Sequence, residues 1–154
     1  MENNIQNTNF TRTQLELDLG KQLNALISAS HALNVRTAAV FDPTLQPASF
    51  LIVRWLLSYG PATATLLAES TAMDRSSVSR LVTQLKQLGY VISETHPEDR
   101  RGVLISLTES GREKASNAIK EKEKEFYKRI SNWEDSELKT FVEMLKYFNG
   151  STDH

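Results

Sequence analysis

Four small or apolar residues in the middle of the chain have a spacing that few folds can accommodate. They occur in the order Ala68-x3-Ala72-x5-Val78-x2-Leu81. A helix-turn-helix needs a small residue where its two helices touch, a tight turn four residues later, and apolar contacts in the second helix that fix the crossing angle. The spacing meets these needs in order, so it predicts a short helix over residues 64–70, a turn, and a second helix over residues 74–88.

The second of these helices has an apolar face and a polar face. The residues predicted to point inward are Val78, Leu81, Val82 and Leu85. The opposite face carries side chains that can hydrogen-bond base edges or phosphates, namely Ser76, Arg80, Thr83, Gln84 and Gln87. Residues 75–93 contain three basic residues and no acidic one. Since most polar helix faces contact only water, this face alone does not establish a DNA-binding helix.

A β-hairpin is predicted directly after this helix. Two runs rich in β-branched and aromatic residues, 90–92 and 103–107, flank the segment Pro97-Glu98-Asp99-Arg100-Arg101-Gly102. We therefore expect an antiparallel hairpin with a long, charged tip. Such a wing can place Arg100 or Arg101 in the minor groove of DNA, and Asp99 can orient an arginine through an ion pair. The order of elements predicts a winged helix-turn-helix.

Amphipathic helices flank this winged unit on both sides. Apolar residues recurring every three or four positions predict helices over residues 13–41, 50–59, 109–131 and 135–148. Asp42-Pro43 and the following Pro47 are expected to form the connection after the first of these helices. Residues 1–12 are rich in Asn and Gln, and we expect a disordered tail there. The predicted fold class is mainly α with a small β-hairpin wing.

The outer helices carry more apolar surface than a small DNA-binding unit can cover. The residues in these stripes are Leu15, Leu19, Leu23, Leu26 and Ile27 at one end and Leu138, Phe141, Val142, Leu145 and Phe148 at the other. We expect them to form a dimer interface, although the two stripes could instead cover each other within one chain. A dimer would also place two recognition helices about one turn of DNA apart.

Several motifs in this order resemble those of the MarR family of transcriptional regulators. They are Met73-Asp74-Arg75-Ser76-Ser77-Val78-Ser79-Arg80-Leu81-Val82, Leu85-x2-Leu88-Gly89-Tyr90-Val91, the wing segment 97–102, and Leu107-Thr108-Glu109-Ser110-Gly111-Arg112. The match is specific over about residues 62–115 and compatible in element order over nearly all of 13–148. Ala72 departs from the pattern, because glycine is common at that position of the turn.

The resemblance implies a function and a set of site residues. It implies a single domain over 13–148, with a winged helix-turn-helix at about 48–107 and dimerisation helices at about 13–41 and 109–148. It implies a homodimer bound to a pseudo-palindromic double-stranded DNA operator, most often as a repressor that a small, often aromatic, ligand releases. The expected DNA contacts are Arg75, Ser76, Ser77, Arg80, Thr83, Gln84, Arg100 and Arg101, with Asp99 orienting the wing arginines.

A ligand site is predicted from the residues near the expected cleft between the dimer helices and the DNA-binding unit. The candidates are His31, Arg54, Trp55 and Tyr59. Trp55 and Tyr59 are four residues apart and therefore share a helix face. The alternative is that the aromatic rings pack in the core and that the aliphatic part of Arg54 covers apolar surface.

Composition excludes several other classes of protein. The chain has no cysteine and three histidines, which argues against a thiolate zinc site or a thiol redox sensor, and we expect no metal or other cofactor. It lacks a phosphate-binding glycine loop and a recognisable catalytic set, so we do not expect an enzyme. No apolar run is long enough for a membrane helix and residues 1–9 lack the order of a secretion signal, so we expect a cytoplasmic protein.

Two alternative functions remain open at this point. The first is a regulator that no ligand controls, and the second is a winged-helix module that binds protein instead of DNA. The net charge of −1 does not exclude a nucleic-acid partner, because every acidic residue lies outside the basic segment 75–93. The clustered arginines Arg75, Arg80, Arg100 and Arg101 argue against the protein-binding module.

Overall fold

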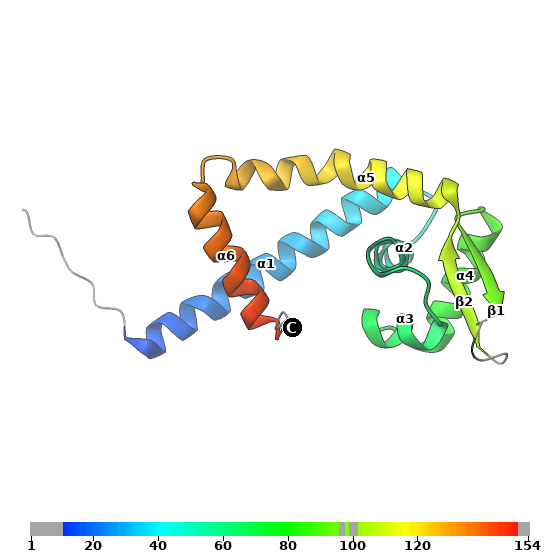
Figure 1. Ribbon diagram of the computed structural model, residues 1–154, viewed down its shortest axis with the longest axis horizontal. Coiled ribbons are helices and arrows are strands. Elements are labelled where there is room, and N and C mark those ends of the chain that lie inside the picture. Colours follow the sequence, from blue (N-terminus) through cyan, green and yellow to red (C-terminus); the bar gives the residue numbers. More distant parts are fainter. Residues whose placement is uncertain (1–10, 96–97, 99–101, 151–154) are drawn as a thin grey trace, which may run out of the picture.

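The computed structural model describes residues 11–95, 98 and 102–150. It is mainly helical with one antiparallel hairpin, which confirms the predicted fold class (Figure 1). The elements are α1 (Arg12–Phe41), α2 (Pro47–Tyr59), α3 (Ala64–Thr71), α4 (Arg75–Gln87), β1 (Val91–Thr95), β2 (Val103–Leu107), α5 (Glu109–Tyr127), the 3₁₀ turn η1 (Lys128–Ile130) and α6 (Asp135–Phe148).

The helix ends follow from local side-chain chemistry. Thr11 and Gln14 form a capping box at the start of α1, so the helix begins at Arg12, inside the segment predicted as a tail. The start of α2 differs more from the prediction, because the helix begins at Pro47 and not at Phe50. Proline is well suited to the first position of a helix, where its missing N–H has no partner to lose. Pro47 therefore starts α2 and does not extend the connection.

The helices form an elongated framework with the helix-turn-helix and the hairpin at one end (Figure 1). Helix α5 runs alongside the C-terminal half of α1, and α2 packs against both. The unit formed by α2, α3, α4 and the hairpin lies at the far end of this pair. The N-terminal half of α1 extends away from it, and α6 follows the opposite end of α5.

The hydrophobic core lies inside the unit built from α2 to β2 and beneath the adjoining ends of α1 and α5. Its largest fully buried apolar side chains are Phe41, Phe50, Ile52, Leu56, Leu67, Leu81 and Leu85. By contrast, α6 has no buried residue. Apolar side chains along the N-terminal half of α1 are also exposed, including Leu15, Leu17, Leu19, Leu26 and Ile27. A single chain therefore leaves the apolar side chains of α6 and of the N-terminal half of α1 largely uncovered.

The hairpin is fixed to the helices by a backbone contact that the sequence analysis did not predict. Its register pairs Val91 with Leu107 and Thr95 with Val103. On the other side of β2, Ala62 and Ile105 exchange two hydrogen bonds, with N···O distances of 3.0 and 2.8 Å. This bridge ties the segment between α2 and α3 to the hairpin.

Candidate nucleic-acid interface

The turn between α3 and α4 is formed by Ala72 in a left-handed conformation. Its backbone angles are φ 55° and ψ 33°, a region in which a residue with a Cβ is disfavoured. The backbone N–H groups of Ala72 and Met73 both donate to the carbonyl oxygen of Ala68. Ala68 is buried where the helices touch, so the helix-turn-helix predicted from the spacing is present.

Helix α4 buries one face and exposes the other. Val78, Leu81, Val82 and Leu85 are buried, as predicted. The exposed face carries Ser76, Arg80, Thr83 and Gln87, which are spaced so that they lie along one side of the helix. Gln84 is half-buried beside them. This face presents hydroxyl, guanidinium and amide groups to solvent, a set that suits base edges and phosphates.

Asp74 caps the start of α4. Its Oδ1 accepts a 2.8 Å hydrogen bond from the backbone N–H of Ser77, and its Oδ2 accepts another of 2.8 Å from the Ser77 hydroxyl. These hydrogen bonds, the backbone one first, lower the pKa of Asp74 below its usual value. The carboxylate thus stays ionised at the helix N-terminus, where the helix dipole favours negative charge.

A shallow hollow of about 210 Å³ lies between α4 and the hairpin. Its polar side chains are Ser79, Thr83, Lys86 and Ser93. The exposed Lys86 lies on the hairpin side of α4. The sequence analysis did not select Ser79, Lys86 or Ser93 as site residues, because only the tertiary fold brings β1 next to the outer face of the helix.

The junction between the hairpin and α5 is very close. Thr108 donates its hydroxyl hydrogen to the Gly89 carbonyl at 2.6 Å and accepts from the Gly111 N–H at 3.0 Å. A Cβ at position 111 would overlap the carbonyl group of Tyr90. The Leu-Thr-x-x-Gly motif therefore has a physical reason, since only glycine lets α5 begin this close to the hairpin.

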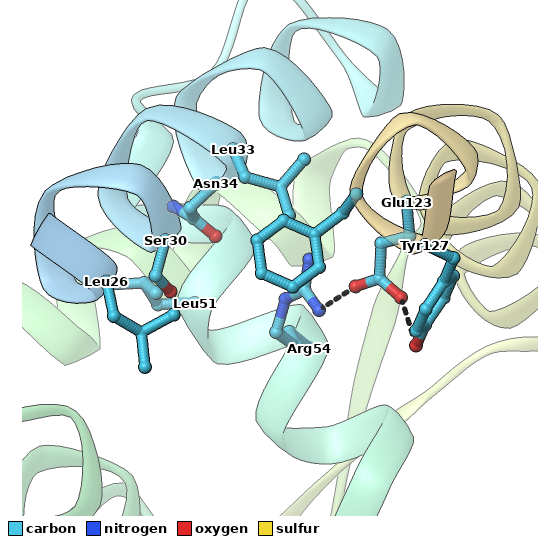
Figure 2. Close-up of a pocket in the computed structure, with 9 residues that line it drawn as sticks. Leu26, Ser30, Leu33, Asn34, Leu51, Arg54, Glu123 and Tyr127 are labelled. Atoms are coloured by element: carbon cyan, nitrogen blue, oxygen red, sulfur yellow. Dashed lines mark hydrogen bonds and ion pairs between the residues drawn. The ribbon is translucent and has the colours of Figure 1, made fainter. Parts of the chain in front are cut away.

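A cavity of about 370 Å³ opens between α1, α2 and α5 (Figure 2). Its lining residues are Leu26, Ser30, Leu33, Asn34, Leu51, Arg54, Glu123, Phe126 and Tyr127. Arg54 Nη1 lies 2.7 Å from Glu123 Oε1, which links α2 to α5. Both side chains are partly buried, with 32% and 19% of their surfaces exposed. The cavity therefore lies where the outer helices meet the helix-turn-helix unit.

Comparison with known proteins shows which family the chain resembles. Residues 44–102 match the model of the MarR family. The chain is 31% identical over 99 residues to the HTH-type transcriptional repressor NicR of Pseudomonas putida, covering 61% of each chain. It is 26% identical over 134 residues to YpoP of Bacillus subtilis, an uncharacterized HTH-type transcriptional regulator, covering 87% of this chain and 93% of that one. The chain therefore resembles the MarR family over its helix-turn-helix part.

Solved structures of MarR proteins share the fold. A MarR family protein from Bacillus stearothermophilus superposes with a TM-score of 0.74 at 20% identity, over 92% of this chain and 97% of that one. The apo form of Escherichia coli MarR gives a TM-score of 0.67 at 21% identity, over 84% and 96% of the two chains. These solved structures show that the chain shares their winged helix-turn-helix fold, and the sequence relatives it matches are helix-turn-helix transcriptional regulators.

The structure brings some of the predicted DNA contacts onto one face. Arg75, Ser76, Arg80 and Thr83 are exposed on α4. The hydroxyl of Ser77 is directed to Asp74, and the hydroxyl of Thr83 donates to the Ser79 carbonyl oxygen at 2.9 Å. Each hydroxyl oxygen still has acceptor capacity. Asp99, Arg100 and Arg101 lie outside the described residues.

Three of the four predicted ligand residues line one hollow, and the fourth lies apart from it. Arg54 lines both this hollow and the cavity between α1, α2 and α5. Trp55 and Tyr59 line the same open hollow, which measures about 360 Å³ and lies between α2 and α3, with ring centroids 4.9 Å apart. Trp55 also packs against the core, whereas Tyr59 is 74% exposed. His31 is exposed on α1 and does not line the cavity.

Most of the cavity could not be predicted from the sequence. Glu123 is 69 residues from Arg54, Phe126 lies on the same helix as Glu123, and Asn34 comes from a third helix, α1. Nothing in the local pattern of the Lys/Glu-rich segment 120–125 distinguishes Glu123 from its exposed neighbours. Over residues 11–95, 98 and 102–150, no helix is long and apolar enough to cross a membrane, and no cluster of three metal-binding side chains is found.

Proposed function

We propose that this regulator is a homodimeric repressor that binds a pseudo-palindromic operator and is released by a small ligand. The observation that carries the proposal is the solvent-exposed face of α4, where Ser76, Arg80 and Thr83 lie on the side opposite the core. An α-helix fits the major groove, and side chains of these types read base edges there.

We assign the residues of the operator contact as follows. Arg80 and Gln84 would contact base edges, since arginine pairs with guanine and glutamine with adenine. Arg75, Ser76 and Ser77 at the start of the helix would contact phosphates or bases, as would Thr83 two turns further along. Arg101, together with Arg100, would enter the minor groove from the wing, with Asp99 orienting them. A charged wing of this kind favours DNA over protein as the partner.

The dimer is supported by apolar surface that one chain leaves uncovered. On α6, large apolar side chains including Phe141, Val142, Met144, Tyr147 and Phe148 are more than two-fifths exposed. The N-terminal half of α1 is exposed in the same way. A second copy would bury both surfaces, since stable homodimer interfaces are apolar. Under this proposal helices 13–41 and 109–148 form the dimerisation part of one domain, and residues 48–107 form the winged unit.

Repression and ligand release are supported by different observations. NicR, which shares 31% identity over 99 residues, is a transcriptional repressor. The cavity of about 370 Å³ is within the range of small-molecule sites. Because it lies between the outer helices and α2, a molecule bound there would alter the position of the winged unit relative to its dimer partner. A regulator of this kind acts on chromosomal DNA, so we place it in the cytoplasm.

The proposal is tested by sedimentation and footprinting of the full chain. Sedimentation equilibrium should give a mass twice that of the 17.4 kDa monomer. Hydroxyl-radical footprinting on a site selected from random DNA should show two protected half-sites about one helical turn apart. A monomer, or a single protected half-site, would contradict it. A dimer that binds DNA but responds to no cavity ligand would instead favour a regulator controlled by its abundance.

A further inference from the structure

The hollow between α4 and the hairpin has one charged residue in its wall, Lys86. The other lining residues are serine, threonine, alanine, valine and isoleucine, which carry no charge. Lys86 is exposed, and its ammonium group makes no ion pair or hydrogen bond with a described residue. The wall of the hollow therefore carries an uncompensated positive charge.

Cations in two other hollows already have partners. Arg54 Nη1 lies 2.7 Å from Glu123 Oε1. Lys114 donates to the hydroxyl oxygen of Tyr90 at 2.7 Å, and the acidic Glu113 lines the same hollow as Lys114. An anion approaching either cation would compete with a group of the protein. An anion in the hollow between α4 and the hairpin would meet no such competitor among the described residues.

The pleat of the hairpin keeps an acidic side chain away from this hollow. Ser93 of β1 pairs with Ile105 of β2, and both residues line the hollow. Successive side chains of a strand point to opposite faces, so the neighbouring Glu94 lies on the other face of the hairpin. The alternation of β1 thus leaves the charge of Lys86 unopposed.

On α4, the polar residues of the hollow lie beside the outward face and not at its centre. Ser79 and Lys86 are seven residues apart, about two turns, so they share one side of the helix. Arg80 and Gln87 each follow one of them by a single residue, a rotation of about 100°. Lys86 is therefore placed toward the hairpin, whereas Arg80 is placed to contact a base edge.

The position of the hollow matches the path of a DNA strand. Under the proposed function, on which this inference rests, α4 lies in the major groove and the hairpin reaches the adjacent minor groove. One sugar-phosphate strand separates two adjacent grooves, so it must pass between α4 and the hairpin, which pack side by side (Figure 1). The hollow of about 210 Å³ lies on this path. Sites for whole small molecules measure about 300–1,000 Å³, so this smaller hollow suits a single phosphate group.

We propose that the hollow binds one phosphate of the operator in each half-site, with the ammonium group of Lys86 as its counter-charge. The hydroxyl of Ser79 has no hydrogen-bond partner among the described residues and donates to the same phosphate. Val82 and Ile105 are buried parts of the wall that limit the access of water, which strengthens the attraction between the charges. A contact of this kind fixes the register of α4 and the hairpin on the duplex without reading its sequence.

Replacing single phosphates by methylphosphonates tests the proposal on the full-length protein. A methylphosphonate keeps the DNA backbone but carries no charge. Each phosphate in one half-site of an operator selected by the wild type is replaced in turn, and the affinity is measured by fluorescence anisotropy. We expect one phosphate, on the strand between the two occupied grooves, whose replacement weakens binding of the wild type by about tenfold. The same replacement should weaken binding of Lys86→Gln by about twofold at most, because its side chain has no charge to lose a partner.

Two further variants serve as controls. Lys86→Arg keeps the positive charge and should keep the penalty of about tenfold at that phosphate. Lys120→Gln removes the same charge from an exposed position on α5 and should keep the penalty as well. Circular dichroism checks that Lys86→Gln is folded, as expected for a substitution at an exposed position. The scan of the wild type alone also tests the proposal, since it needs no variant.

The outcomes are distinct. Loss of the penalty in Lys86→Gln, with its retention in both controls, supports the inference. Equal penalties in the wild type and Lys86→Gln at every phosphate overturn it and leave operator binding intact. A wild type that is insensitive to every replacement on that strand also overturns it. Failure to select any operator from random DNA contradicts the proposed function itself, and the inference falls with it.

Discussion

The hydroxyl of Tyr90 donates a 2.7 Å hydrogen bond to Oδ2 of Asp42, across 48 residues of sequence. Tyr90 directly precedes the hairpin, and Asp42 caps the end of α1. Lys114 on α5 donates to the same hydroxyl oxygen at 2.7 Å, and the ring centroids of Tyr90 and Phe41 lie 4.7 Å apart. The start of the wing is thus joined to both long helices through one buried side chain.

The Asp42 carboxylate should make folding stability depend on pH. The hydroxyl of Thr44, at 2.6 Å, is the largest cause of a lowered pKa, burial opposes it, and Tyr90 adds to the lowering. A carboxyl group whose pKa is lower in the folded state stabilises the protein above its unfolded pKa of about 3.9, and that stability is lost as the pH falls through the folded value.

We therefore predict that Asp42→Asn destabilises the protein at neutral pH and that the difference from wild type shrinks in acid. Urea unfolding at fixed protein concentration, repeated from neutral pH down to about pH 3, measures the difference. Asp18→Asn, at an exposed position of α1, is the control and should show little change with pH. A difference for Asp42→Asn that stays constant over this range would show that the charge of the carboxylate is not what stabilises the junction.

We predict that glycine at position 72 makes the folded protein more stable than the natural alanine does. A φ of 55° costs a residue with a Cβ about 1–2 kcal/mol. Glycine avoids this cost, but it also gives the unfolded chain more conformational freedom, which offsets part of the gain in stability. Ala72→Gly should therefore raise the free energy of unfolding by about 0.5–1 kcal/mol. Ala68→Gly, four residues earlier inside α3, should lower it. Equal effects of the two substitutions would argue against a strained turn.

Gly111 should not tolerate a methyl group. The added Cβ of Gly111→Ala would overlap the Tyr90 carbonyl, so either α5 or the hairpin must move, at a cost of about 1–3 kcal/mol or more. Gly20→Ala is the matched control, because Gly20 lies inside α1 with no atom near its missing Cβ. Alanine there should stabilise the helix by up to about 1 kcal/mol. Thermal unfolding of both variants compares the two sites, and a neutral Gly111→Ala would rule out the close junction.

The wing arginine Arg101 should contribute mainly through charge. We predict that Arg101→Ala weakens binding to selected and random DNA alike and reduces the slope of log affinity against log salt concentration by about one unit. Fluorescence anisotropy over a range of salt concentrations measures this slope. An unchanged affinity at every salt concentration would remove Arg101 from the DNA interface.

The local elements could be predicted from the sequence, and the contacts between distant elements could not. Helix α6 has the predicted bounds because its apolar period and its capping box at Glu134 and Glu137 act within a few residues. The helix-turn-helix was likewise predictable from the spacing of Ala68 and Ala72. These features depend on neighbours along the chain.

The rest depends on residues that only folding brings together. The bridge between Ala62 and Ile105 is one isolated pair, so the sequence around it has no repeating apolar pattern that would predict it. The pair Arg54 and Glu123 joins residues on helices that are far apart in sequence, and each alone resembles an ordinary charged surface residue. The sequence predicts a connection at Pro47, where α2 in fact begins, because proline both starts helices and interrupts them and the pattern alone does not distinguish these uses.

The central claim is that the exposed face of α4 reads DNA sequence, and Arg80 tests it most directly. The measurement is the affinity of Arg80→Ala for a site selected by the wild type and for a scrambled site of the same length, by fluorescence anisotropy. Lys120→Ala on α5 removes the same charge from an exposed position as a control.

If Arg80 contacts a base, its loss should weaken binding to the selected site by about 1–3 kcal/mol and binding to the scrambled site much less. Lys120→Ala should leave the ratio of the two affinities unchanged. Equal weakening of Arg80→Ala on the selected and scrambled sites would contradict the assignment of α4 as the helix that reads the operator.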